Sequence, residues 1–291
     1  MKADPFGASR KRLLGIAYRM LSSRTEAEDV LQDAWLRFNG VRDVQNRERL
    51  LTTIVTRLCL DRLKSAQARR EAYTGPWLPE PIADTAALSP DAPTELADDL
   101  SFALLLTLER LTPAERAAFL LHDVFDMPFS EVALILGKSE AASRQLATRA
   151  RKSVREARPA YRPPADTHRR LLAAFGMAVS TGDVAALSRL FHEDAVMVAD
   201  GGGKVLTALN PITGADRIAR FFIGTVRKFG SQMPELQIEW AEVNGSPAIV
   251  ARIDESIAQV LQLAIREYRI AMVYVVRNPD KLAWLRGGTL Q

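Results

Sequence analysis

The apolar pattern of this chain changes period near three prolines, Pro159, Pro163 and Pro164. Before them, apolar residues recur at helical spacing. Beyond about residue 166, short runs rich in Val and Ile alternate with Gly, Pro and Asn. The two periods require different packing, so we expect an all-α half followed by an α+β half. A chain of 291 residues is long enough for two or three small domains.

Two long helices are predicted before residue 72. Thr25 and Glu28 form a capping box at the start of a helix that runs to Phe38, and a second helix covers about residues 47–70. Cys59, the only cysteine, lies on the apolar face of the second helix, which indicates a buried thiol. A single cysteine excludes an internal disulfide and fits the reducing cytoplasm.

An acidic, proline-rich linker is predicted over residues 73–99. It has five prolines and no sustained helical pattern. Residues 76–100 carry six acidic and no basic side chains, whereas the segments 1–75 and 101–165 have net charges of +6 and +3. Basic segments suit phosphate backbones, but a run of charge is as often a solvated face. The motifs within these segments must decide between the two.

The second basic segment contains a helix-turn-helix pattern. Residues 129–136 supply a supporting helix, Gly137 permits a tight turn, and Ser139 caps the next helix. One face of that helix would meet base edges through Glu140, Arg144, Thr148 and Arg151. Phosphates would pass near Arg149, Lys152 and Arg155. The alternative is a solvated amphipathic helix with no ligand.

The C-terminal half has the composition of a compact α+β domain. Helices are predicted at about 167–181, 183–191 and 215–228, and strands at 195–199, 205–209, 236–243, 248–253, 257–265 and 270–276. The glycine run of residues 200–204, DGGGK, is interpreted from its composition alone as a hairpin turn.

Two segments carry a family resemblance. RLLGIAYRMLSSRTEAEDVLQDAWLRF (Arg12 to Phe38) and LTPAERAAFLLHDVFDMPFSEVALILGKS (Leu111 to Ser139) resemble regions two and four of the extracytoplasmic-function sigma factors. The resemblance spans residues 10–158 and implies a cytoplasmic promoter-recognition factor. Its implied partners are the RNA polymerase core, through the β′ clamp helices and the β flap, and promoter DNA. The implied domains are 1–72 (region two), 73–99 (linker), 100–160 (region four) and 161–291 (regulatory domain).

The resemblance also implies roles for individual residues. Residues that would face the β′ clamp helices are Asp29, Gln32, Asp33 and Leu36. Residues that would contact the −10 element are Gln45, Asn46, Arg47, Arg49, Thr53, Arg57 and Arg62. Residues that would contact the −35 element are Glu140, Ser143, Arg144, Thr148, Arg149, Arg151 and Lys152. Region two lacks an aromatic cluster for strand melting, so melting should depend on a good −10 sequence.

Three shorter motifs resemble a subgroup of these sigma factors that carries a SnoaL-like C-terminal domain. They are WLPEP at residues 77–81, DGGGK at 200–204 and NPDKL at 278–282. The resemblance implies a cone-shaped α+β barrel that regulates the sigma factor in cis, with no separate anti-sigma protein required. The implied regulatory contact comprises Trp77, Leu78, Pro79, Asp200, Gly201, Gly202, Gly203, Lys204, Asn278, Pro279 and Asp280.

A catalytic alternative remains open at this stage. His192, Asp194 and Asp200 lie close in sequence and could move protons. No metal-ligand spacing and no pairing of a nucleophile with a base accompanies them, so we expect no catalytic residues, no metal and no cofactor. The rival hypothesis is a SnoaL-like enzyme or ligand sensor fused to a helix-turn-helix regulator, with an unknown small ligand in its pocket. No apolar stretch approaches the roughly 20 residues of a membrane span.

Overall fold

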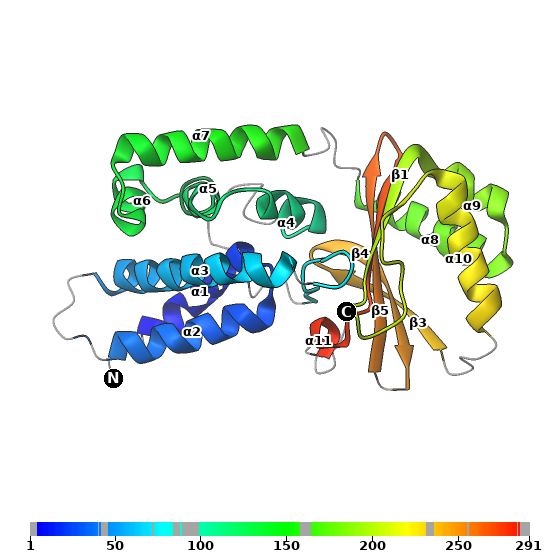
Figure 1. Ribbon diagram of the computed structural model, residues 1–291, viewed down its shortest axis with the longest axis horizontal. Helices are drawn as coiled ribbons and strands as arrows, with labels where there is room; N and C mark the ends of the chain where they lie inside the picture. Colours follow the sequence, from blue (N-terminus) through cyan, green and yellow to red (C-terminus); the bar gives the residue numbers. More distant parts are fainter. Residues whose placement is uncertain are drawn as a thin grey trace. The chain divides into compact units, whose positions relative to one another are not determined.

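The computed structural model describes residues 5–39, 41, 46–71, 73–83, 88, 99–157, 164–230, 236–254, 256–283 and 285 (Figure 1). The chain divides into two compact units. The N-terminal unit comprises residues 1–72 and 84–158, and the C-terminal unit comprises residues 73–83 and 159–291. By its contacts, the first part of the linker therefore belongs to the C-terminal unit.

Three helices begin the N-terminal unit: α1 (Pro5–Leu21), α2 (Arg24–Asn39) and α3 (Arg47–Glu71). The second half of α1 is buried on all sides, from Leu13 to Leu21, because α2 and α3 both pack against it. Cys59 of α3 is fully buried, as its apolar neighbours predict.

The second helical group comprises α4 (Phe102–Glu109), α5 (Pro113–Phe119), the π-helical turn η1 (Leu120–Val124), α6 (Phe129–Leu136) and α7 (Glu140–Ala157). The capping box predicted at Thr25 is wrong, because α2 begins at Arg24 and Ser23 accepts from the Glu26 N–H at 3.1 Å. A capping box is present at the start of α5, where Thr112 and Glu115 satisfy each other's backbone N–H groups. Gly137 ends α6 in the left-handed conformation, with φ of 62°. The helix-turn-helix prediction is thus confirmed in its local geometry.

The C-terminal unit combines helices with one mixed sheet. Its elements are α8 (Ala165–Thr181), α9 (Val184–Leu190), β1 (Phe191–Asp200), β2 (Ile212–Thr213), α10 (Ala215–Phe229), β3 (Leu236–Val243), β4 (Ser246–Ile253), β5 (Ser256–Arg266), β6 (Arg269–Val276) and α11 (Pro279–Leu282). The strand order is β2-β1-β6-β5-β4-β3, and β1 and β6 are the parallel pair.

Helices α8, α9 and α10 cover one face of the sheet (Figure 1). The core between them is apolar and includes Phe175, Phe191, Met197, Ile218 and Leu263. Phe175 packs edge-on against Phe191, with ring centroids 6.2 Å apart. The all-α half and the α+β half are therefore both as predicted.

One predicted strand is wrong. Residues 205–209 form part of a loop between β1 and β2, and Leu206 and Leu209 are exposed. The run is apolar, but three glycines precede it and Pro211 follows it closely. Because Gly and Pro both weaken strand pairing, the run does not join the sheet. No helix in the described part of the chain is long and apolar enough to span a membrane.

Candidate functional site

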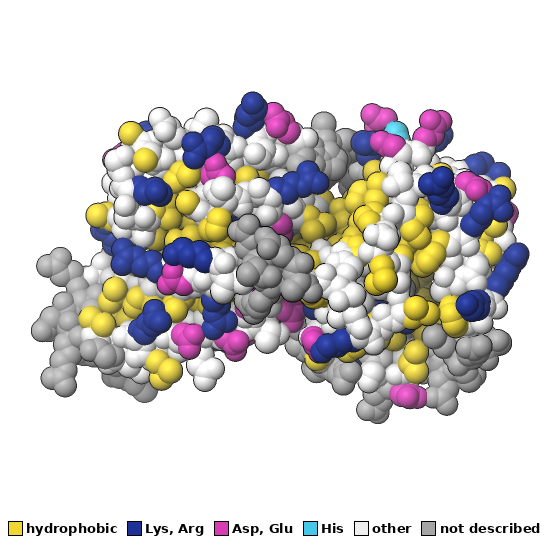
Figure 2. Space-filling view, in the orientation of Figure 1, with side chains coloured by type: hydrophobic (Ala, Val, Ile, Leu, Met, Phe, Trp, Pro, Cys, Tyr) yellow, Lys and Arg dark blue, Asp and Glu magenta, His cyan; other side chains and the backbone are white. Residues whose placement is uncertain are grey.

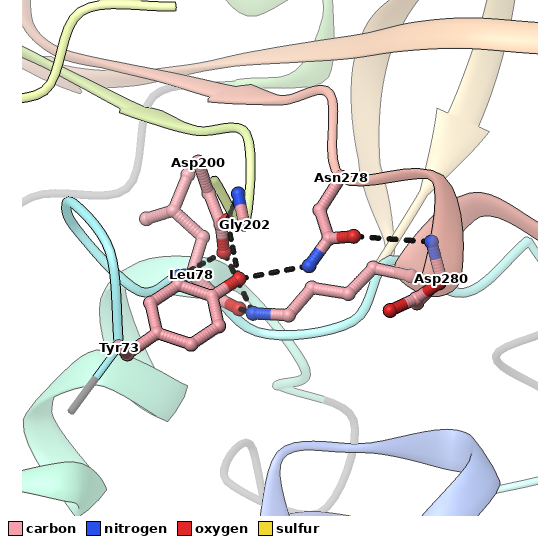
Figure 3. Close-up of polar contacts among 7 residues, drawn as sticks. Tyr73, Leu78, Asp200, Gly202, Asn278 and Asp280 are labelled. Carbon is pink, nitrogen blue, oxygen red and sulfur yellow. Dashed lines mark hydrogen bonds and ion pairs between the residues drawn. The ribbon is translucent and has the colours of Figure 1, made fainter. Parts of the chain in front are cut away.

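The Asp200 carboxylate is the centre of a buried polar cluster in the C-terminal unit (Figure 3). Asp200 ends β1, and its side chain is fully buried. It accepts hydrogen bonds from the Tyr73 hydroxyl at 2.6 Å and from the Leu78 backbone N–H at 2.8 Å. It also accepts from Lys281 Nζ at 2.7 Å and from the Gly202 N–H at 3.0 Å. Two of its four donors thus come from the linker.

Lys281 supplies the positive charge that balances Asp200. Its side chain is 12% exposed, and it also donates to the Leu78 carbonyl. The ammonium group lies 4.2 Å from the centroid of the Trp77 ring and 5.2 Å from that of Tyr73. Buried carboxylates and ammonium groups need such pairing, and the two rings add cation–π attraction.

Tyr73 fixes the direction of proton donation in the cluster. Its hydroxyl donates to Asp200 and accepts from Asn278 Nδ2 at 2.8 Å. Burial, together with the hydrogen bond to Asp200 and the charge of that carboxylate, raises the pKa of Tyr73 well above its usual value. Tyr73 therefore remains a donor at neutral pH. Asn278 also caps α11, where its Oδ1 accepts from the Asp280 N–H.

The glycine run lets the linker approach closely. Gly202 has φ of +61°, and a Cβ there would collide with the Asn278 side chain. A Cβ on Gly203, with φ of +71°, would lie 3.0 Å from Cβ of Thr74 in the linker. A Cβ on Gly201 would lie 2.7 Å from the Val205 carbonyl oxygen. DGGGK is therefore a contact loop as well as a turn.

A second attachment holds the linker at Ile82. The Ile82 N–H donates to Asn244 Oδ1 at 2.9 Å, and the Asn244 N–H donates to the Ile82 carbonyl at 2.7 Å. Asn244 has φ of +52° in the turn between β3 and β4. Residues 78–82 between the two attachments are buried, whereas Trp77 is only partly buried. We name Asp200, Gly202, Asn244, Asn278 and Lys281 the linker clasp.

The outward face of α7 is basic. Arg144 and Arg151 lie over the Phe129 ring at 5.1 and 5.9 Å from its centroid. Arg151 also pairs with Asp123 at 2.6 Å, and Arg149 with Glu115 at 2.7 Å. These contacts hold the guanidinium groups against α5, η1 and the N-terminal end of α6. Figure 2 shows Lys and Arg side chains over α7 and α3 on the visible face of the N-terminal unit.

The outward face of α2 combines acidic and apolar side chains. Leu36 is 67% exposed, and Gln32 is exposed one turn before it. Asp29 and Asp33 flank Arg62 of α3, with oxygen–nitrogen distances of 3.6 and 3.0 Å. The opposite face of α2 is buried through Ala27, Val30, Leu31, Ala34 and Phe38, so this strip lies on the outer side of the helix.

Comparison with known proteins decides the family. The sigma-70 region 2 model matches residues 6–69, and the sigma-70 region 4 model matches residues 101–154. The ECF RNA polymerase sigma factor SigJ of Mycobacterium tuberculosis is 38% identical over 291 residues, covering 97% of this chain and 93% of SigJ. This chain belongs to the ECF RNA polymerase sigma factors. SigI of the same organism, named a probable ECF sigma factor, is 33% identical and covers 97% of each chain.

A crystal structure of M. tuberculosis SigJ superimposes on this ECF sigma factor with a TM-score of 0.76. The sequences are 35% identical in that alignment, which covers all of both chains. The similarity therefore extends through the C-terminal unit as well as the sigma regions. The prediction of an ECF sigma factor with a SnoaL-like domain is confirmed.

The structure places the proposed −10 residues of this sigma factor mainly along α3. Asn46 lies at its N-terminus, where Oδ1 accepts from the Arg49 N–H at 2.9 Å. Thr53 and Arg57 continue the same face at successive turns, whereas Gln45 lies outside the described residues. Arg62 instead turns toward α2, where it pairs with Asp33. In the structure the Arg62 guanidinium thus contacts the acidic strip of α2, and its contact with the −10 element stays a prediction.

One proposed −35 residue needs correction. Ser143 is fully buried, and its hydroxyl donates to the Ser139 carbonyl at 3.1 Å. It therefore lies on the inward face of α7, with Leu146, Ala147 and Ala150, and does not reach DNA. The remaining exposed or partly exposed members of the −35 set are Glu140, Arg144, Thr148, Arg149, Arg151 and Lys152.

Sequence reasoning missed Tyr73, Ile82, Asn244 and Lys281 as clasp contacts. Lys281 lies within the NPDKL motif, so the motif itself was the available signal. Asn244 and Gly245 form a sequence that is typical of an ordinary hairpin turn. The sequence therefore gives no sign that Asn244 also binds Ile82 of the linker.

Proposed function

We propose that this ECF sigma factor directs promoter-specific initiation in the cytoplasm and that its C-terminal unit regulates it in cis through the linker clasp. In this proposal the exposed strip of α2 docks on the β′ clamp helices, and region four meets the β flap. The exposed face of α3 contacts the −10 element, and the basic face of α7 contacts the −35 element. The observation that carries the cis mechanism is the buried Asp200, whose donors include Tyr73 and Leu78 of the linker.

The cis mechanism requires no separate anti-sigma protein, because the chain supplies its own contact. The clasp and the linker belong to one polypeptide, so their encounter benefits from a high effective concentration. The linker between the two sigma regions determines how far those regions can separate. A domain that holds residues 73–82 therefore acts on the segment that governs promoter engagement.

We propose that the C-terminal unit is not catalytic. The polar groups Asp200, Asn244 and Asn278 are buried, and each contacts the linker. The core between the helices and the sheet is apolar. The side chain of Asp194 is 64% exposed and pairs with Arg266, and His192 lies beside it at 2.8 Å. The His192 and Asp194 pair therefore lies at the surface, outside the apolar core.

Transcription in vitro tests the proposed function. The full chain is combined with core polymerase on a library of promoter sequences, and duplex binding by the chain alone is measured in parallel. We expect transcripts from a defined promoter class only when core polymerase and the chain are both present. A simple regulator would instead bind its duplex site tightly without polymerase, and that result would reject the sigma mechanism in favour of the rival hypothesis.

Charge reversal on α2 tests polymerase docking. We expect Asp29→Lys combined with Asp33→Lys to weaken binding to core polymerase by about tenfold or more, equivalent to ~1.4 kcal/mol. A titration of labelled core polymerase measures the affinity, with circular dichroism to confirm folding. Asp61→Lys, which reverses a more exposed charge on α3, is the control. Equal affinities for the double variant and the control would remove α2 from the docking site.

Two single substitutions on α7 test −35 recognition. Arg144→Ala should cost about 1–3 kcal/mol at one or two base positions, because a base-edge contact is sequence-specific. Lys152→Ala should weaken binding evenly across sequences and reduce its salt dependence, because a phosphate contact releases counterions. Holoenzyme binding to a set of −35 variants at several salt concentrations separates the two effects. The opposite assignment of effects would show that the other face of α7 meets the bases.

A further inference from the structure

Leu88 of the linker is fully buried in the N-terminal unit. Its carbonyl accepts a hydrogen bond from Arg19 Nη1 at 2.9 Å. Its backbone lies so close to α1 that a Cβ on Gly15 would come within 2.5 Å of the Leu88 carbonyl oxygen. Gly15 thus provides a seat for one residue of the linker.

Arg19 connects this seat to both sigma regions. It belongs to α1 of region two, is fully buried, and also donates to the Gly15 carbonyl at 3.3 Å. Its guanidinium lies 5.6 Å from the centroid of the Phe125 ring, which belongs to region four. One side chain therefore contacts region two, the linker and region four.

Further contacts hold region two against region four within this unit. Arg57 Nε donates to the Ile135 carbonyl at 3.2 Å and Nη2 to the Leu134 carbonyl at 3.3 Å, at the C-terminal end of α6. A helix C-terminus favours such a cation. Arg12 Nη2 donates to the Phe125 carbonyl at 3.3 Å. A residue proposed to contact the −10 element, Arg57, is thus engaged by the helix-turn-helix itself.

In the closed arrangement, regions two and four lie too close together to bind the −10 and −35 elements at the same time. Elements at −10 and −35 are about 25 base pairs apart, which is ~85 Å along the duplex at ~3.4 Å per base pair. A compact unit of about 150 residues has a radius of gyration of only ~15 Å. Regions two and four must therefore separate before both elements are bound.

We propose that Leu88, seated on Gly15 and Arg19, is a latch that keeps region two closed on region four in the free protein. This proposal deepens the proposed function, on which it rests. Release of Leu88 frees Arg19 from its linker contact and allows Arg57 to leave α6. The clasp holds the linker as far as Ile82, six residues before Leu88 in the sequence, so the clasp and the latch act on one short segment.

Gly15→Ala in the full chain tests the latch. Alanine is the better helix former by about 1 kcal/mol, so α1 itself is not weakened, but the new Cβ collides with the Leu88 backbone. Gly224→Ala is the matched control, because a Cβ at that position of α10 meets nothing within 4 Å. Leu88→Asp keeps the backbone carbonyl but replaces a fully buried apolar side chain with a charged one that is costly to bury, so it disfavours the seated position from the linker side and leaves α1 unchanged.

The measurement is energy transfer between dyes on region two and region four. Lys64→Cys and Glu156→Cys supply labelling sites whose native side chains are 73% and 66% exposed. Burial raises the pKa of the Cys59 thiol, so this native cysteine stays unlabelled. In the free protein we expect high transfer efficiency for the wild type and for Gly224→Ala. A low-efficiency population should become the major one in Gly15→Ala and Leu88→Asp.

Wild-type transfer efficiency in both latch variants would overturn the proposal. If Gly15→Ala loses helix content by circular dichroism, Leu88→Asp alone decides the result. Core-dependent transcription by the same proteins tests the proposed function separately from the latch. Failure of wild-type transcription would reject the proposed function, whereas an unchanged transfer efficiency would reject only the latch.

Discussion

We expect Asp200→Ala to release the linker from the C-terminal unit. The substitution removes the acceptor for Tyr73 and Leu78 and leaves Lys281, whose side chain is 12% exposed, without its carboxylate. Breaking a buried ion pair by removing one partner costs about 3–5 kcal/mol, because an uncompensated charge stays buried. The loss falls on the segment that Asp200 holds, so residues 73–82 should separate from the domain before the sheet unfolds.

Hydrogen exchange of the linker measures this release. Backbone amides of residues 73–82, including the Leu78 N–H that Asp200 binds, should lose protection in Asp200→Ala. Asp280→Ala is the control, since Asp280 pairs with Lys204 in a contact whose side chains are 65% and 54% exposed. Such surface pairs contribute about 0–1 kcal/mol, so linker protection should persist there. Equal protection in the two variants would exclude Asp200 as the anchor.

The same variant tests regulation. Because the clasp holds the segment that joins the two sigma regions, Asp200→Ala should change promoter-dependent transcription while the N-terminal unit remains folded. Transcription equal to that of Asp280→Ala, with the linker demonstrably released, would show that the clasp is a structural attachment with no regulatory effect.

The boundary between the all-α half and the α+β half could be predicted because local sequence patterns differ on its two sides. The helix period of residues 47–70 and the Val-rich and Ile-rich runs after residue 236 depend only on neighbours in sequence. The turn at Gly137 and the helix cap at Ser139 are likewise local signals. Each of these was predicted correctly for that reason.

The linker contacts depend on distant parts of the chain. Tyr73 and Asp200 are 127 residues apart, and Ile82 and Asn244 are 162 residues apart. No period or composition in residues 73–83 indicates which surface will receive them. The three motifs suggested the partners by resemblance, but Leu78 and Ile82 are fully buried, whereas Trp77 is only partly buried.

Buried arginines were the other limit of sequence reasoning. Arg19 interrupts the apolar run of α1 and would ordinarily lie at a surface, yet it is fully buried against Leu88. Ser143 illustrates a signal that was available: it lies three residues before Leu146 and four before Ala147, on the inward face of α7. Helical spacing alone would have excluded it from the DNA-contacting set.

Arg116→Ala should destabilise the N-terminal unit by about 3–5 kcal/mol, because it leaves the largely buried Glu109 carboxylate without its cation. Arg116 is 2% exposed and pairs with Glu109 at 2.8 Å. It also donates to the Met20 carbonyl of region two at 2.6 Å, and Glu109 accepts from the Ser22 hydroxyl at 2.7 Å. The pair thus contributes to the stability of region four and to its contact with region two.

Urea denaturation of the full chain, monitored by hydrogen exchange in α4 and α5, measures the loss of stability. Arg110→Ala, which removes an exposed arginine next to the same pair, should stay within about 0.5 kcal/mol of the wild type. Arg116→Met combined with Glu109→Gln should recover much of the stability, because removing both charges leaves no uncompensated ion. If Arg116→Ala were no less stable than Arg110→Ala, the pair would not support the unit. If the double variant were as unstable as Arg116→Ala, the cost would come from the lost Met20 contact and not from a buried charge.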